Sequence, residues 1–121
     1  MGIYVSVRGW LECDEKQLAA IREVIAAHDE GFYSGGWGFP AKPFNWISYV
    51  FYGGDIRHLS VDWFLGQLAA IARIPASDED NDRVRGLFFA SHEQDGLSEW
   101  QVRDGQVLVS AGDDRYRYLD E

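Results

Sequence analysis

Hydrophobic and polar residues alternate at the start of the chain. Ile3, Val5 and Val7 fall on one side of an extended backbone, and the residues between them are more polar. A period of two is typical of a half-buried β-strand. We therefore predict a strand over residues 3–11.

The period then lengthens to that of a helix. Asp14 is a suitable N-cap, and Gln17 three residues later completes a capping-box pattern. These signals predict an amphipathic helix over residues 15–28, ended by Gly31. Its buried stripe consists of Leu18, Ile21 and Ile25.

Residues 45–52 read Asn-Trp-Ile-Ser-Tyr-Val-Phe-Tyr. This enrichment in aromatic and β-branched residues predicts a central strand. The Gly53-Gly54 pair that follows matches a two-residue hairpin turn, so we expect the chain to return through a short strand over residues 55–58.

A second helix is expected next. Ser60 is placed to cap it, Leu59 and Phe64 are spaced as a hydrophobic staple, and Pro75 lies just past its end. Its buried stripe consists of Phe64, Leu65, Leu68, Ile71 and Ala72.

The last third of the chain has the pattern of strands joined by short turns. Residues 93–96 predict one turn, and Asp104-Gly105 predicts a tight hairpin. The expected strands cover residues 84–92, 99–103, 107–109 and 116–119, the last of them closing the sheet.

The predicted order of elements is β-α-β-β-α-β-β-β, with one further strand at the end. Two helices among hairpin-linked strands are typical of an α+β fold, so we predict a mostly antiparallel sheet with both helices packed on one face. A length of 121 residues favours a single domain over residues 1–121.

Residues 33–46 combine glycines and prolines, which interrupt regular structure, with five aromatic side chains. Two interpretations of this Gly/aromatic loop stay open. Either Trp37 and Phe39 fold back over the core, or they stand out as anchors for a partner, because tryptophan is enriched at interface hot spots. A third hypothesis is that the rings of the loop line a pocket for a small molecule or a peptide.

Acidic side chains outnumber basic ones by twenty to eleven, which gives a net charge of −9 and a pI near 4.6. Nucleic acid and anionic membranes are therefore poor partners, and a basic protein is favoured. Residues 77–99 hold seven of the acids and only two arginines. The acids that we expect to contact a partner are Asp78, Glu79, Asp80, Asp82, Glu93 and Asp95.

Motifs for metal binding and catalysis are incomplete. Asp78, Asp80 and Asp82 have the spacing of the first ligands of a calcium loop, but Arg83 and Phe89 replace its glycine and its closing glutamate. An enzyme that uses His92 and Glu93 as an acid–base pair is the least favoured hypothesis. We therefore expect a protein that is not an enzyme and needs no metal or cofactor.

The chain has a single cysteine, Cys13, so it forms no internal disulfide and suits a reducing compartment. No apolar run approaches the ~20 residues of a membrane span, and the first residues lack a signal-peptide pattern. We expect a cytoplasmic protein, and the oligomeric state stays open.

Three segments stand out together: Gly9-Trp10 near the end of the first predicted strand, "RGLFFASHE" at residues 85–93 and "EWQVRDGQV" at residues 99–107. In these segments, and in the order of elements, the chain resembles the immunity proteins of bacterial polymorphic toxin systems, particularly the immunity protein seven family. The resemblance implies a cytoplasmic protein that binds a cognate toxin domain and blocks it. Many such toxins are basic nucleases, and an acidic partner attracts a basic one and speeds association.

Overall fold

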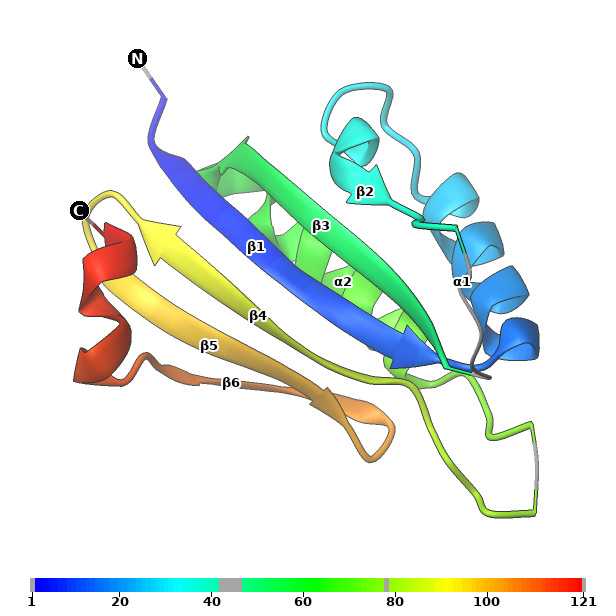
Figure 1. Cartoon of the computed structure of the whole chain (residues 1–121). Helices are drawn as coiled ribbons and strands as arrows, with labels where there is room; N and C mark the ends of the chain where they lie inside the picture. The colour runs from blue at the N-terminus through cyan, green and yellow to red at the C-terminus, as the bar shows by residue number, and fades with distance from the viewer. Residues whose placement is uncertain (1, 42–46, 78, 121) are drawn as a thin grey trace.

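The computed structural model describes residues 2–41, 47–77 and 79–120. Its centre is a six-stranded sheet with the order β2-β3-β1-β4-β5-β6, in which every neighbouring pair is antiparallel (Figure 1). The predicted α+β class is confirmed. The strands are β1 (Tyr4–Cys13), β2 (Trp37–Gly38), β3 (Ser48–Arg57), β4 (Arg85–His92), β5 (Gly96–Arg103) and β6 (Gln106–Ala111).

Two α-helices and three short 3₁₀ helices complete the described fold. They are α1 (Glu15–Ala27), α2 (Val61–Ala72), η1 (Ser34–Gly36), η2 (His58–Ser60) and η3 (Asp114–Asp120). The capping box predicted for the first helix is present: the amide of Gln17 donates to the Asp14 carboxylate at 2.8 Å, and the amide of Asp14 donates to the Gln17 side chain at 3.0 Å.

One face of the sheet is covered, and it carries the core. In Figure 1, α2 runs behind the sheet and α1 lies on the side of β2 and β3. Phe64 of α2 is fully buried, and its ring centroid lies 5.7 Å from that of Phe88 and 5.9 Å from that of Trp100. Of the stripe predicted for α1, Ile21 is buried in this core, and Leu18 and Ile25 are partly buried against it. Strand residues that share the core include Val5, Val7, Leu11, Val50, Ile56 and Val102.

Gly9 and Phe88 determine how closely β1 and β4 approach. The two residues are opposite each other in the β1–β4 ladder. A Cβ atom on Gly9 would lie only 2.6 Å from the Phe88 Cα and from one of its ring carbons. Glycine is therefore needed at this position because the Phe88 ring occupies the space of its missing side chain.

The predicted hairpin at Gly53-Gly54 is wrong. Both glycines lie inside β3, opposite Arg8 and Val7 of β1, and the strand runs unbroken from Ser48 to Arg57. The ten-residue β1 provides hydrogen-bonding partners along the whole of β3, so the chain has no need to turn. Residues 45 and 46, where the sequence predicted the strand to start, lie outside the described residues.

Two further predictions fail at the ends of elements. Residues 116–119 form part of η3 rather than a closing strand. Leu59 is 89% exposed, so it makes no staple with buried Phe64, and the Ser60 side chain makes no cap hydrogen bond. The hairpin at Asp104-Gly105 is confirmed, because both residues have the positive φ angles (53° and 79°) that a two-residue turn with this twist requires.

No helix in the described part of the chain is both long enough and apolar enough to cross a membrane.

Candidate functional site

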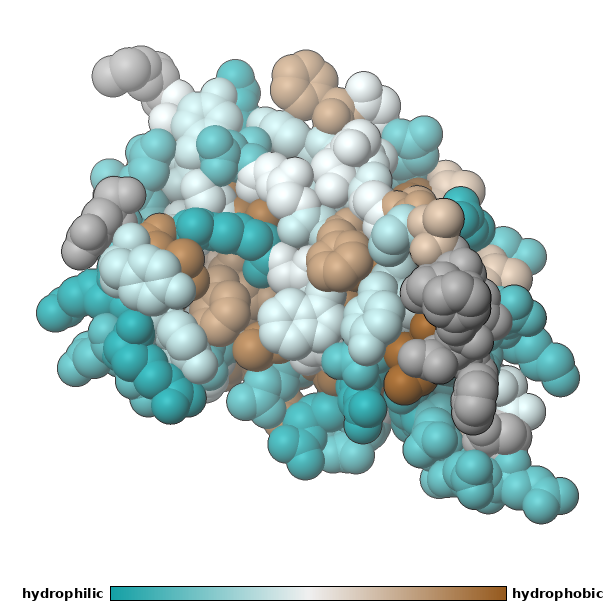
Figure 2. Space-filling view, in the orientation of Figure 1, coloured by the Kyte–Doolittle hydropathy of each residue, from teal (hydrophilic) through white to brown (hydrophobic). Residues whose placement is uncertain are grey.

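The face of the sheet opposite α1 and α2, here called the open face, carries a row of large apolar side chains. The strand registers place Phe51 of β3, Trp10 of β1 and Leu87 of β4 directly side by side. Phe51 is 48% exposed, and its neighbour Tyr49, whose ring stacks on it, is 42% exposed. Figure 2 shows separate hydrophobic residues in the middle of this face, among residues of intermediate hydropathy, and mostly hydrophilic residues at its margins. We call Phe51, Trp10 and Leu87 the apolar row.

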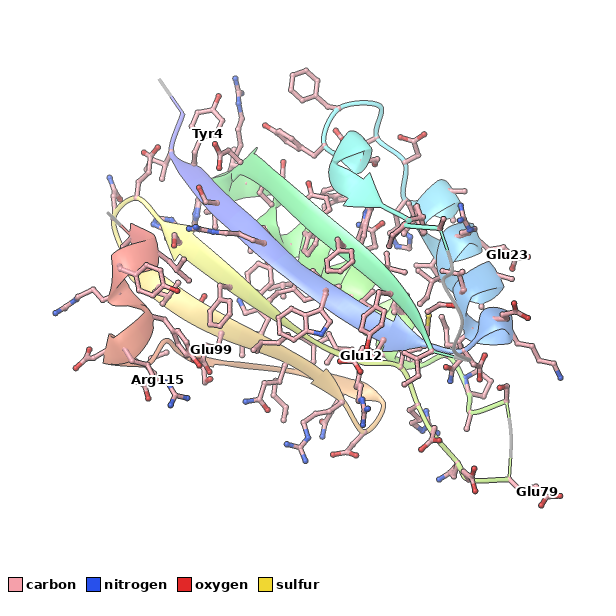
Figure 3. The ribbon with its side chains drawn as sticks, viewed as in Figure 1. Tyr4, Glu12, Glu23, Glu79, Glu99 and Arg115 are labelled. Carbon is pink, nitrogen blue, oxygen red and sulfur yellow. The ribbon has the colours of Figure 1, made fainter. Side chains whose placement is uncertain are left out.

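Charged side chains lie on both sides of the apolar row. Glu12 is next to Tyr49 and Arg85 in the ladders, accepts a hydrogen bond from the Trp10 indole nitrogen at 3.0 Å, and pairs with Arg85 at 3.4 Å. On the other side, Glu99 lies opposite Phe89. Figure 3 shows Glu12 and Glu99 on this face, toward its two ends. The apolar row thus lies between two carboxylates.

The C-terminal helix η3 covers one corner of the open face. The Tyr116 ring packs on Phe89 with centroids 4.9 Å apart, and the Arg115 guanidinium lies 4.8 Å from the Tyr116 ring. Arg8 donates to the main-chain oxygen of Leu119 at 2.7 Å, so β1 helps to hold η3 in place. Between η3 and the turn after β5, a groove of about 850 Å³ runs along the face, with Trp10, Leu87 and Gln101 in its lining.

Trp37 and Phe39 do not stand out from the surface, so the anchor interpretation of these two rings is wrong. Trp37 is 9% exposed and stacks on Phe64 with ring centroids 5.5 Å apart. Its partner Tyr52 lies opposite it in the short β2–β3 ladder. Phe39 is partly buried against the core, under the Arg22 guanidinium at 4.1 Å. The glycines let the chain fold these rings inward, which is the other interpretation of the loop.

The pocket hypothesis for residues 33–46 corresponds to an open hollow in the structure. A hollow of about 490 Å³ lies between α1 and the loop, and Phe32 and Phe39 are its aromatic walls. Phe32 is 77% exposed, so the hollow opens to solvent. Residues 42–46, which include the last two rings of the loop, lie outside the described residues.

The predicted acids fall into two separate groups. Glu79, Asp80 and Asp82 are exposed on the loop before β4, and Figure 3 shows Glu79 pointing away from the sheet. Glu93 and Asp95 are exposed after β4, at its other end. An eight-residue strand separates the groups by about 23 Å. The acidic segment is therefore not one patch but two, which flank the open face, and Asp78 lies outside the described residues.

The proposed pair of His92 and Glu93 is not formed by a hydrogen bond between these side chains in the described structure. The His92 Nδ1 atom accepts from the amides of Gln94 and Asp95, both at 3.0 Å. Its Nε2 atom lies 3.0 Å from Nδ1 of His58. The ladders bring these two histidines together from β4 and η2, and sequence spacing gave no sign of it.

Cys13 and Tyr52 are buried groups whose pKa values are shifted upward. Burial, with a smaller contribution from the Asp14 carboxylate, raises the pKa of Cys13 from 9.0 to about 11. Burial, with the charge of Glu30 adding to it, raises the pKa of Tyr52 to about 12. Cys13 is therefore an unreactive thiol at neutral pH.

The pKa of Asp14 is shifted downward. Burial alone would raise it, but hydrogen bonds from Ser77 and from main-chain amides lower it.

The folded protein should lose stability above about pH 9. Between the pKa of the unfolded chain and the higher pKa of the folded state, Cys13 and Tyr52 are ionised in the unfolded chain but neutral in the folded protein. The resulting loss of stability is absent below the unfolded pKa and grows as pH rises toward the pKa of the folded state. Urea unfolding at pH 7.5 and at pH 10 measures the change. Cys13→Ala should reduce the loss, and an equal loss in that variant would show that the thiol contributes nothing.

The open face could have been found from the sequence by one signal. Tyr49 and Phe51 alternate with Val50 and Tyr52, so the first half of β3 is apolar on both faces. A strand segment with two apolar faces indicates that the core covers one face and that a binding partner covers the other.

Comparisons of the chain with protein-family models, with curated proteins and with solved structures give no match.

Proposed function

We propose that this chain is a binding protein that neutralises a cognate toxin domain, and that it binds this partner with the open face of its sheet. The observation that carries the proposal is the apolar row: Phe51, Trp10 and Leu87 lie side by side on a face that neither α-helix of the described residues covers. Large contiguous apolar surface is uncommon on monomeric proteins and marks interaction sites.

The arrangement has the anatomy of a protein interface. Specific interfaces have an apolar centre rich in aromatic side chains and a polar rim. Here the centre is the apolar row with Tyr49, and the rim includes Glu12, Glu99 and the two acidic groups at the ends of β4. Rings with few rotatable bonds on a rigid sheet lose little conformational entropy on binding.

Charge indicates the kind of partner. A net charge of −9 favours a basic protein. The exposed acids before and after β4 would steer its approach, while the apolar row would hold the complex once formed. The resemblance to polymorphic-toxin immunity proteins supplies the class: a basic toxin domain, blocked in the cytoplasm. The free and buried Cys13 agrees with a reducing compartment.

The test is binding kinetics against the toxin domain encoded beside this chain's gene. Phe51→Ala should speed dissociation by about 30-fold or more, as expected for a hot-spot ring. Phe32→Ala is the matched control, because Phe32 is more exposed but lies just before the Gly/aromatic loop, in the hollow beside α1. Reversing Glu79, Asp80 and Asp82 to Lys should mainly lower the association rate and flatten its salt dependence.

Different outcomes test the location of the interface and the neutralising function. Unchanged dissociation of Phe51→Ala would move the interface away from the open face. A larger effect of Phe32→Ala than of Phe51→Ala would favour the Gly/aromatic loop instead. If the unmodified protein binds no neighbouring gene product and protects no cell from one, the neutralising function itself is wrong.

A further inference from the structure

The two edges of the sheet are built differently. The β2 edge is two residues long, and Pro40 lies two residues after its end; short strands and prolines are devices that prevent edge-to-edge pairing. The β6 edge has six residues, Gln-Val-Leu-Val-Ser-Ala, with no charge and no proline. Its register with β5 is unbroken, so it carries no bulge. None of the usual protections is present on β6.

The outer hydrogen-bonding groups of β6 are directed away from the sheet. The amide of Gly112 donates to the Leu97 carbonyl of β5 at 2.9 Å. Since hydrogen-bonding direction alternates along a strand, the N–H and C=O groups of Val107, Val109 and Ala111 point outward. In the described chain no strand lies beyond β6, as Figure 1 shows. Leu108 is 40% exposed and Val109 is 58% exposed.

We propose that β6 pairs with β6 of a second copy of this chain, antiparallel and about a twofold axis at Leu108. In this register Val107 lies opposite Val109 of the second copy, and their outward groups form two pairs of hydrogen bonds about the axis. The two Leu108 side chains meet on the open-face side, and the exposed Val109 of each copy packs against Val107 of the other. The two sheets become one, with both open faces on the same side.

The charge pattern permits a second copy at this edge and selects the register. Because β6 has no charged residue, two chains of net charge −9 can pair through it without like charges directly opposite each other. About Leu108, Asp104 falls opposite Gly112 of the second copy. A shift of the axis to Val109 would instead place Asp104 opposite Asp114, which is unfavourable. Because the rest of both chains repels, this dimer should tighten as salt is added.

Sedimentation equilibrium over about 1 to 100 μM protein tests the proposal. The mass should rise with concentration from 13.8 kDa toward twice that value, and should rise further at high salt. Val109→Lys should remain at the monomer mass, with an unchanged circular dichroism spectrum because the side chain is exposed. Leu59→Lys is the matched control, since it adds the same charge to an exposed side chain of η2.

Hydrogen exchange locates the contact. The amides of Val107 and Val109 should exchange more slowly at high protein concentration than at low concentration, and in the Val109→Lys variant the exchange of the Val107 amide should not depend on protein concentration. A monomer mass at every concentration and salt would overturn the proposal. So would a dimer that Val109→Lys leaves intact, or one in which the amides of Val107 and Val109 are not slowed. Salt also separates this dimer from the toxin complex, whose association should weaken as salt is added.

Discussion

Replacing Trp37 by alanine should lower the free energy of unfolding by about 3–5 kcal/mol. The ring is 9% exposed, and it is surrounded by aromatic partners at centroid distances of 5.0 Å (Tyr52), 5.5 Å (Phe64) and 6.3 Å (Phe88). Alanine would leave a cavity between β2 and α2 that these rings cannot fill without moving. Urea unfolding followed by far-ultraviolet circular dichroism measures the loss.

Phe32→Ala is the control for this experiment. Phe32 belongs to the same part of the chain but is 77% exposed, so its removal should change stability by less than about 0.5 kcal/mol. Equal effects of the two substitutions would contradict the inward position of Trp37. The same pair also discriminates between core and anchor, because an anchor ring would affect binding and not stability.

Substituting Gly9 by alanine should be at least as damaging, by about 3 kcal/mol or more. The added methyl group would lie 2.6 Å from the Phe88 Cα, and main chain cannot move aside as a flexible side chain can. The clash falls in the middle of the β1–β4 ladder, so the two strands would have to separate there. Thermal unfolding by calorimetry is a suitable measurement.

Gly53→Ala is the matched control, one ladder away on β3. Gly53 lies opposite Arg8, and an added Cβ there would have no atom within 4 Å. Because glycine weakens a strand, alanine should be neutral or stabilise the protein by up to about 1 kcal/mol. A strong destabilisation would mean that Gly53-Gly54 is the turn that the sequence predicted rather than a continuous strand. Normal stability of Gly9→Ala would contradict the close packing of Phe88 on β1.

Local patterns in the sequence were sufficient for most of the fold. The capping box at Asp14, the helical stripe of α2 and the turn at Asp104-Gly105 are short-range signals, and each is present in the structure. The hairpin prediction at Gly53-Gly54 is wrong because a glycine pair fits a hairpin turn when only the local sequence is considered. The alternation of Val50, Tyr52, Gly54 and Ile56 continues through the two glycines. The strand continues there because β1 is long enough to pair with all of β3.

The candidate site was harder to predict, because it depends on which strands become neighbours. Nothing local places Phe51 beside Trp10, or Trp10 beside Leu87, since these residues are far apart along the chain and meet only through the ladders. For the same reason the sequence alone predicts a single group of acids over residues 77–99. β4 runs between them and carries Glu93 to the opposite end of the sheet from Asp82.

The central position of β1 has a consequence for synthesis on the ribosome. β1 is the first strand to be made, yet it pairs on one side with β3 and on the other with β4, which ends at His92. At about 5–20 residues per second, roughly 4–16 s pass between the two strands. During that interval the nascent chain exposes the apolar side chains of β1, including Val5 and Val7, with one hydrogen-bonding edge unoccupied. Nascent chains of this protein should therefore depend on ribosome-associated chaperones more than nascent chains of a protein whose strands pair only in local hairpins.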